Sequence, residues 1–291
     1  MKLLSVVIPI HSKAPRLRLT LAGLRGQVDQ GDVQLIVAAD QATEAVRAVL
    51  RDETEAVIVE SSRRGRAAAR NAGAARADGE TLVFVDDDIL VESDFLRCHR
   101  QAQAKSPGLV HGALREIIGL LSVEDPAEGG PGCPPVDIGA LRAGEWHPAC
   151  VRLVTNALEQ AAEHPDAVRW PWLACAGANL SVPRCAWESV GGFDEGYGAS
   201  WGMEDVDFAY RLWAMGVPIS LAPAAAGFHM SHHHASRWDE QRDNMKRFQA
   251  RAACPEALAL PALLSARGSL RLYREAVDHI RQCGTVPPWL A

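Results

Sequence analysis

Short apolar runs alternate with helical patterns along the first ninety residues. Four runs rich in β-branched residues predict strands: SVVIPI, VQLIVAA, AVIVE and TLVFV. Between them, residues 15–26, 41–51 and 66–77 place apolar or alanine residues at helical spacing. This alternation predicts an α/β fold in which helices cover both faces of a mostly parallel sheet.

The pattern is less regular in the second half of the chain. A helix is predicted near residues 92–105, an apolar stretch follows at 109–118, and residues 122–148 have the Pro and Gly content of a loop. CAGANLSV and PISLAPAAAGFHM predict strands, and MEDVDFAYRLWAMG predicts a helix that stops at Gly216. Beyond residue 237 the patterns are helical and amphipathic.

These patterns predict one α/β domain and a helical tail. The domain covers residues 1–240, with a regular half at 1–100 and a less regular half at 101–240. A C-terminal helical extension covers residues 241–291.

Composition excludes several classes of protein. With 48% hydrophobic and 23% charged residues the chain is typical of globular proteins, and not of disordered or fibrous ones. The formal charge of -6 argues against a nucleic-acid partner. No apolar stretch approaches the roughly 20 residues of a membrane span. Seven cysteines without a C-x-x-C pair, and a start, MKLLSVVIPI, without a cleavage site, predict a cytoplasmic location.

Acidic residues stand at the ends of the predicted strands, where ligands bind in sheets of this kind. The first strand ends at His11-Ser12, the second at Asp40, the third at Glu60 and the fourth at Asp86-Asp87-Asp88. Three carboxylates directly after a buried strand repel one another unless a cation joins them, and oxygen ligands suit Mg²⁺ or Mn²⁺. The alternative is an acidic turn that caps the next helix.

A basic run precedes the third predicted helix. Arg63-Arg64-Gly65-Arg66 leads into this alanine-rich helix, whose N-terminal amides and guanidinium groups together suit a phosphate. Arg66 and Arg70 lie one turn apart, so one of them can point into the cleft. The alternative is a solvated basic turn.

Two further motifs carry candidate chemistry. In WGMEDVDF, Glu204 and Asp205 occupy the first turn of a helix, whose dipole favours ionised carboxylates that can accept a proton. Simple helix capping is the alternative. In FHMSHHH, an imidazole could complete a metal site, although histidine clusters also occur on flexible surfaces and all three adjacent histidines cannot be ligands.

In order and spacing, these motifs resemble glycosyltransferase family 2, the inverting nucleotide-sugar transferases of the GT-A fold. The likeness covers residues 3–235, from VVIPIHSK through RGRAAARNAGAARADGETLVFVDDD to the closing histidine. GGFDEGYGASWGMEDVDFAYRL with HMSHHH also resembles the carboxyl half of the β-1,4-galactosyltransferases and polypeptide N-acetylgalactosaminyltransferases. The resemblance implies a Rossmann-like central sheet, with a nucleotide-binding half at 1–100 and an acceptor-binding half at 101–240.

The resemblance also implies roles for individual residues. Asp205 would be the general base and Glu204 its acceptor-positioning neighbour, beside Trp201 and Gly202 in the acceptor site. The nucleotide would lie against Pro9, His11, Asp40, Arg66, Asp86 and Asp87. A Mn²⁺ or Mg²⁺ ion would be held by Asp88 and Asp86, with His229 or His233. Family members often carry Tyr-Asn where this chain has His11-Ser12, which predicts different stacking beneath the base.

The implied activity is metal-dependent, inverting transfer of a sugar from a nucleotide-sugar donor. A UDP-sugar is the favoured donor. The acceptor is a glycan, a peptide or a small natural product. The alternatives are a metal-dependent phosphohydrolase, which would use only the acids and histidines, and a non-catalytic nucleotide-sugar-binding domain.

Overall fold

The computed structural model describes residues 4–28, 31–146, 151–153, 169–234, 236–265 and 268–290. It divides into two compact units, of which unit 1 comprises Met1–Ala199 with Glu204–His234, and unit 2 comprises Ser200–Met203 with Ala235–Ala291. The strands are β1 (Leu4–Ile10), β2 (Val33–Ala39), β3 (Ala56–Glu60), β4 (Thr81–Val85), β5 (Ile89–Val91), β6 (Leu109–Ile117), β7 (Val151–Leu153), β8 (Asn179–Pro183) and β9 (Ile219–His229).

The helices of unit 1 are α1 (Ala14–Val28), α2 (Glu44–Arg51), α3 (Arg66–Ala75), α4 (Phe95–Lys105), α5 (Ile138–Ala143), α7 (Arg184–Ser189) and α8 (Glu204–Ala214). Unit 2 contains α9 (Arg237–Ala252), α10 (Pro255–Leu258) and α11 (Leu270–Cys283). The helices and strands predicted for the first ninety residues are all present, each within a few positions of its expected bounds.

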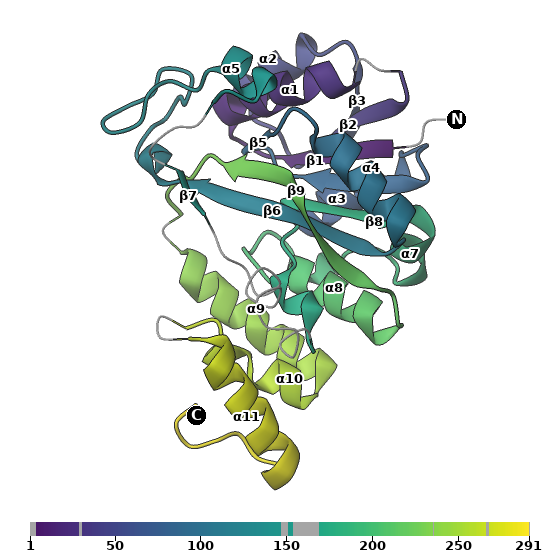
Figure 1. The fold of residues 1–291 in the computed structure, drawn as a ribbon, viewed down its shortest axis with the longest axis vertical. Coiled ribbons are helices and arrows are strands. Elements are labelled where there is room, and N and C mark those ends of the chain that lie inside the picture. Colours follow the sequence, from purple (N-terminus) through teal and green to yellow (C-terminus); the bar gives the residue numbers. More distant parts are fainter. Residues whose placement is uncertain are drawn as a thin grey trace. The chain divides into compact units, whose positions relative to one another are not determined.

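One mixed sheet runs through unit 1 (Figure 1), in the order β3-β2-β1-β4-β8-β6-β9-β5 with β7 beside β6 among the described residues. The pairs β3-β2, β2-β1 and β1-β4 are parallel, as the alternating pattern predicts. The second half adds antiparallel pairs, because β8 enters between β4 and β6 in the opposite direction. The predicted α/β fold is confirmed. Neighbouring strands are continuously parallel only across the run β3-β2-β1-β4.

Helices cover both faces of the parallel part. Leu17 and Leu21 of α1 share a hydrophobic cluster with Val6 and Ile8 of β1. On the other face, α3 packs so closely that a Cβ on Gly73 would lie 2.5 Å from a methyl of Val7. Because successive strand residues point to opposite faces, α1 and α3 enclose β1 from both sides.

The strand register brings distant residues to one edge of the sheet. The carboxyl ends of β1, β2 and β4 meet there because these strands are parallel neighbours. The chain then turns through Asp86–Asp88 into β5, which pairs antiparallel with β9 so that Ile89 faces His229. β6 runs parallel to β9 on its other side, with Glu116 opposite His229. This register therefore sets His229 beside the acidic turn.

The segment predicted as a loop at 122–148 is partly helical in its described part. Asp137 caps α5 by accepting a hydrogen bond from the Ala140 amide, and Gly144 ends it in the left-handed conformation. The loop prediction is wrong here because the short IGALRA helix is hidden among Pro and Gly residues. The segment is also anchored by apolar side chains, since a second hydrophobic cluster includes Cys133, Val136, Leu141 and Trp146.

Unit 2 has its own internal contacts. The Trp201 amide donates to Glu240 Oε2 at 2.6 Å, and the Asn244 amide group donates to the carbonyls of Trp201 and Gly202 at 3.1 and 2.9 Å. α9 therefore fixes the Trp201-Gly202 segment within this unit. The Tyr273 hydroxyl donates to the Glu256 carbonyl at 3.0 Å and joins α11 to α10.

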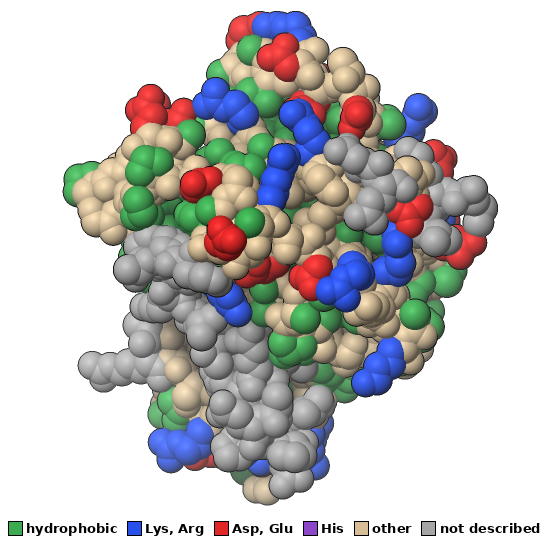
Figure 2. Space-filling model, turned by 45° about the horizontal axis from the view of Figure 1, so that its top comes forward, with side chains coloured by type: hydrophobic (Ala, Val, Ile, Leu, Met, Phe, Trp, Pro, Cys, Tyr) green, Lys and Arg blue, Asp and Glu red, His purple; other side chains and the backbone are tan. Residues whose placement is uncertain are grey.

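Basic and acidic side chains are interspersed on the face drawn in Figure 2, without separation into fields of one sign among its described residues. In the described part of the chain, no helix combines the length and apolarity that crossing a bilayer requires.

Candidate active site

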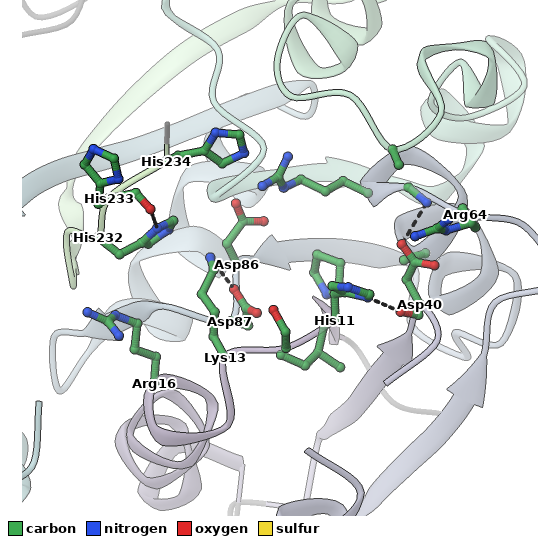
Figure 3. A pocket seen from close by; sticks show the side chains of 17 residues that line it. His11, Lys13, Arg16, Asp40, Arg64, Asp86, Asp87, His232, His233 and His234 are labelled. Atoms are coloured by element: carbon green, nitrogen blue, oxygen red, sulfur yellow. Dashed lines mark hydrogen bonds and ion pairs between the residues drawn. The ribbon is translucent and has the colours of Figure 1, made fainter. Parts of the chain in front are cut away.

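A cavity of about 530 Å³ opens at the carboxyl ends of β1, β2 and β4 (Figure 3), within the range of small-ligand sites. Basic and acidic groups face it together. Its wall includes all six residues expected to contact a nucleotide: Pro9, His11, Asp40, Arg66, Asp86 and Asp87. The structure thus brings together side chains from three strand ends and the start of α3.

Asp40 is held at the cavity wall by backbone groups. Its Oδ2 accepts a hydrogen bond from the Gly65 amide at 2.8 Å, and its Oδ1 is buried with no partner among the described residues. His11 Nδ1 donates to the Asp40 carbonyl at 2.6 Å. Gly65 has φ +104°, and a Cβ there would lie 1.8 Å from the Gly198 carbonyl oxygen, so only glycine fits. One Asp40 oxygen at the cavity wall therefore keeps an unused capacity to accept a hydrogen bond.

Asp88, His229 and His232 form a cluster with metal-binding geometry. Asp88 Oδ2 lies 3.2 Å from His229 Nε2 and 3.1 Å from His232 Nε2, and the three ligand atoms lie within 4.8 Å of one another. Asp88 Oδ1 is buried without a partner among the described residues. The carboxylate and imidazole donors fit Mn²⁺, since Mg²⁺ prefers oxygen ligands alone.

Two of the predicted metal ligands, Asp86 and His233, are not part of this cluster among the described residues. His233 lines the cavity, but it is His232 that reaches Asp88. Asp86 faces the cavity and accepts a hydrogen bond from Arg70 Nη2 at 2.7 Å. Neighbours in the FHMSHHH run point in different directions, so sequence alone could not distinguish His232 from His233.

Glu116 orients His229. Its Oε2 accepts a hydrogen bond from His229 Nδ1 at 2.8 Å and another from the Ser231 hydroxyl. A carboxylate on Nδ1 fixes the ring so that Nε2 faces Asp88. Burial would lower the pKa of His229, but Asp88 and Glu116 raise it to about 10. The negative field of this corner therefore favours a cation. Sequence reasoning missed Glu116, because only the β6-β9 register places it there.

Arg16 holds the segment that follows β9. This buried guanidinium donates to the carbonyls of Met230 at 3.1 Å, Ser231 at 3.3 Å and Val123 at 2.8 Å. It donates also to the carbonyls of Leu120 and Glu124. Five backbone acceptors on one side chain restrict the chain between His229 and His232. Sequence reasoning missed this residue, which has no local signature.

Lys13 reaches the acidic turn from the start of α1. Its Nζ lies 3.1 Å from Asp87 Oδ1 and 2.5 Å from Asp88 Oδ2. Burial raises the pKa of Asp87 to about 6, against the opposing charge of Lys13. Burial also disfavours the charge on Asp88, but Lys13 and His229 hold the pKa of this carboxyl well below its usual range. Sequence reasoning did not assign Lys13.

Arg70 connects the cavity wall to α8. Nη2 donates to Asp86, and Nη1 donates to Glu204 Oε1 at 2.9 Å. The guanidinium is buried, and it packs so tightly on Gly177 that a Cβ there would lie 2.6 Å from Arg70 Cζ. Of the two arginines that share a helical face, Arg66 lines the cavity and Arg70 joins two carboxylates beneath it.

Asp205 is a half-buried carboxylate with two backbone donors. Oδ2 accepts from the Gly177 amide at 3.0 Å, and Oδ1 accepts from the Val206 amide at 2.8 Å. Burial and the neighbouring Glu204 raise the pKa of Asp205 to about 6, although Arg70 opposes this. The shift is opposite to the one expected from the helix dipole. The group stays mostly ionised at neutral pH and is a stronger base than an ordinary Asp.

Fold and site together define a GT-A glycosyltransferase scaffold. Residues 5–119 match the family described as "Glycosyl transferase family 2", and residues 159–235 match the one described as "N-terminal domain of galactosyltransferase". The resemblance is thereby confirmed: the chain has a GT-A fold, and its residues 5–119 match the model of glycosyltransferase family 2.

Curated relatives extend the match. Over 248 residues the chain is 31% identical to the validoxylamine A glucosyltransferase of Streptomyces hygroscopicus subsp. jinggangensis (strain 5008), covering 79% of this chain and 56% of that protein. It is 30% identical to the protein of the same name from subsp. limoneus, covering 79% and 52%. The chain therefore spans about half the length of the curated relatives it matches.

Solved structures share the fold. The mannosyltransferase PcManGT from Pyrobaculum calidifontis, solved with GDP-Man and Mn²⁺, has a TM-score of 0.55 at 17% identity, over 98% of this chain and 76% of its own. GalNAc-T7, solved with UDP, GalNAc and Mn²⁺, has a TM-score of 0.59 at 15% identity, over 99% and 59%. At these identities the likeness concerns the fold alone.

Proposed function

We propose that this chain is a metal-dependent, inverting glycosyltransferase that moves a sugar from a nucleotide sugar to a hydroxyl or other nucleophile of an acceptor. The observation that carries the proposal is the position of the Asp88–His229–His232 cluster, next to a cavity lined by all the residues expected to contact a nucleotide. A metal site and a nucleotide-sized cavity at the same sheet edge suit a bound nucleoside diphosphate.

Different residues of the site are proposed to bind the metal and the nucleotide. Asp88, His229 and His232 would hold Mn²⁺, and such an ion supplies neutralisation of the negative charge that develops on the leaving diphosphate. Asp40, through its unpartnered Oδ1, accepts a hydrogen bond from the base. Pro9 and His11 lie along the base and ribose, and Arg66 lies by the phosphates.

Asp205 serves as the general base. It takes the proton from the acceptor hydroxyl as that oxygen attacks the anomeric carbon from the side opposite the diphosphate, so the configuration inverts. The attack forms the new glycosidic bond and breaks the bond to the phosphate oxygen, and no covalent enzyme intermediate is needed. Glu204, Trp201 and Gly202 are proposed to position the acceptor.

The names of similar proteins guide the choice of substrates. Two relatives are named validoxylamine A glucosyltransferase, which favours glucose as the sugar and a small natural product as the acceptor. The two structural neighbours were solved with different nucleotides, GDP-Man in one and UDP in the other. We propose a UDP-sugar as donor, with UDP-glucose the first to test.

A donor screen tests the proposal. The melting temperature of the purified chain is measured with UDP-glucose, UDP-galactose, UDP-GlcNAc and GDP-mannose, each with Mn²⁺ and with chelator. We expect a matched donor to raise the melting temperature only with Mn²⁺, because ligand binding to the native state stabilises it. Calorimetric titration with UDP then gives the two affinities. Equal affinity with Mn²⁺ and with chelator would overturn the metal role.

Product assays with the donor that binds separate the alternatives. A phosphohydrolase would release inorganic phosphate from the nucleotide and would not need Asp205. A non-catalytic binding domain would bind a donor but form no glycoside with any acceptor tested, validoxylamine A among them. Glycoside formation that requires donor, Mn²⁺ and Asp205 supports the proposed function.

A further inference from the structure

Lys13 stands where a bound cation would stand. Asp88 Oδ2, the oxygen 3.2 Å from His229 Nε2 and 3.1 Å from His232 Nε2, is also 2.5 Å from Lys13 Nζ. An ammonium group and two imidazoles thus share one carboxylate oxygen. A metal ion held by Asp88 and the two histidines would need the space beside this oxygen.

The ammonium and a divalent ion cannot both keep this position. The Asp88 side chain is only 3% exposed, so solvent screens the two positive charges poorly. Asp87, the other partner of Lys13, belongs to the same acidic turn. A metal ion that binds Asp88 therefore repels Lys13 from both carboxylates.

The Lys13 side chain can move from the acidic turn into the cavity. Its side chain is 23% exposed and lines the cavity, on a flexible four-carbon stem. In Figure 3 its side chain reaches Asp87, and a dashed line marks their ion pair. Arg66 lines the same cavity, so an anion bound there would meet two cations. The diphosphate of a nucleotide is an anion of suitable size and charge.

We propose that Lys13 is a further donor-binding residue, which neutralises Asp87 and Asp88 in the metal-free protein and moves to the diphosphate when a divalent metal binds Asp88. This rests on the proposed function. The exchange couples the two ligands, because the metal frees Lys13 for the nucleotide and the nucleotide keeps Lys13 away from the metal. Metal and nucleotide therefore each strengthen the binding of the other.

Calorimetry on Lys13→Gln tests the exchange through two changes of opposite sign. Without nucleotide, Mn²⁺ should bind about 10-fold more tightly than to the wild type, because the competing ammonium is gone. At saturating Mn²⁺, UDP should bind about 10-fold more weakly, because one charged hydrogen bond is lost. Lys13→Arg keeps the charge and should keep UDP binding near the wild-type value.

Arg18→Gln is the matched control. Arg18 lies on α1, which begins one residue after Lys13, but it is 58% exposed and pairs with Asp125. Its loss removes one positive charge without touching the cavity, so both affinities should stay unchanged.

Three results would overturn the proposal for Lys13. Weaker binding of both Mn²⁺ and UDP would indicate a purely structural role, and no change in either affinity would indicate no role. If Lys13→Gln does not fold, the wild-type protein with ¹³C-dimethylated lysines is titrated with UDP and Zn²⁺, a diamagnetic ion that accepts carboxylate and imidazole ligands. An unmoved Lys13 signal would contradict the exchange. Wild-type protein that binds UDP equally with metal and with chelator would instead overturn the proposed function itself.

Discussion

Arg70 Nη1 donates to Glu204 Oε1 at 2.9 Å, an ion pair that joins α3 to the first residue of α8 inside unit 1. The second nitrogen of the same guanidinium binds Asp86 at the cavity wall. The acid at the strand end and the start of the helix that carries Asp205 are therefore positioned by one buried side chain. Glu204, expected to contact the acceptor, is itself buried and committed to Arg70 by one oxygen.

Replacing Arg70 with Met should destabilise the protein strongly. The change leaves Glu204 and Asp86 without their cation, and breaking a buried pair in this way costs about 3–5 kcal/mol. Urea denaturation measures the free energy of unfolding. Arg63→Met is the control, since Arg63 is 69% exposed in its pair with Glu195 and should cost about 0–1 kcal/mol. Equal losses in the two variants would contradict the structural role of Arg70.

Asp205→Asn should abolish transfer while donor binding survives. The amide keeps the shape of the side chain but cannot take a proton, so turnover should fall about 100-fold or more. Rates are measured beside calorimetric donor affinity. Asp243→Asn serves as the control, because Asp243 is 73% exposed and pairs with Lys246. Near-normal turnover of Asp205→Asn would show that another residue is the general base, with Glu204 or Asp207 the next candidates.

The dependence of the wild-type transfer rate on pH should reflect the ionisation of Asp205. Burial and Glu204 raise the pKa of Asp205 to about 6, and only the ionised carboxylate can act as base. Activity should therefore be full above this pH and fall as pH is lowered through about 6. A rate that stays constant down to the ordinary Asp pKa of about 4 would rule out this assignment.

Glu116→Gln should weaken metal binding. The carboxamide can still reach His229 but no longer carries the charge that fixes the ring and its basicity, and such changes cost about 10–100-fold in metal affinity. Mn²⁺ titration followed by electron paramagnetic resonance measures the loss. Asp125→Asn, at an exposed pair with Arg18, should leave the affinity unchanged. Unaltered Mn²⁺ affinity in Glu116→Gln would show that His229 does not need this partner.

Gly65→Ala should destabilise the loop that presents its amide to Asp40. The new Cβ would collide with the Gly198 carbonyl, and φ +104° is unfavourable for alanine, so we expect a loss of about 2 kcal/mol or more. Gly26→Ala, on the exposed side of α1 with open space around it, should instead stabilise by about 0.5–1 kcal/mol. Thermal unfolding compares the two, and the same sign of change in both would be inconsistent with this geometry.

The sequence by itself determined the local structure and much of the cavity wall. Strands β1 to β4 and helices α1 to α3 follow from periodicity, which depends on neighbours along the chain. Parallel strands then bring their carboxyl ends together, so the positions of His11, Asp40 and Asp86 at one edge could be predicted from their places after strands. The short α5 was missed because its six residues lie within a segment rich in Pro and Gly.

The tertiary structure alone decided which side chains meet. Glu116 faces His229 through the register of β6 on β9, and Arg16 reaches the segment after β9 from more than two hundred positions away. The choice of His232 over His233 and the raised pKa of Asp205 depend in the same way on packing. Burial and pairing between distant segments are properties of the assembled sheet and its helices, and no pattern of neighbouring residues encodes them.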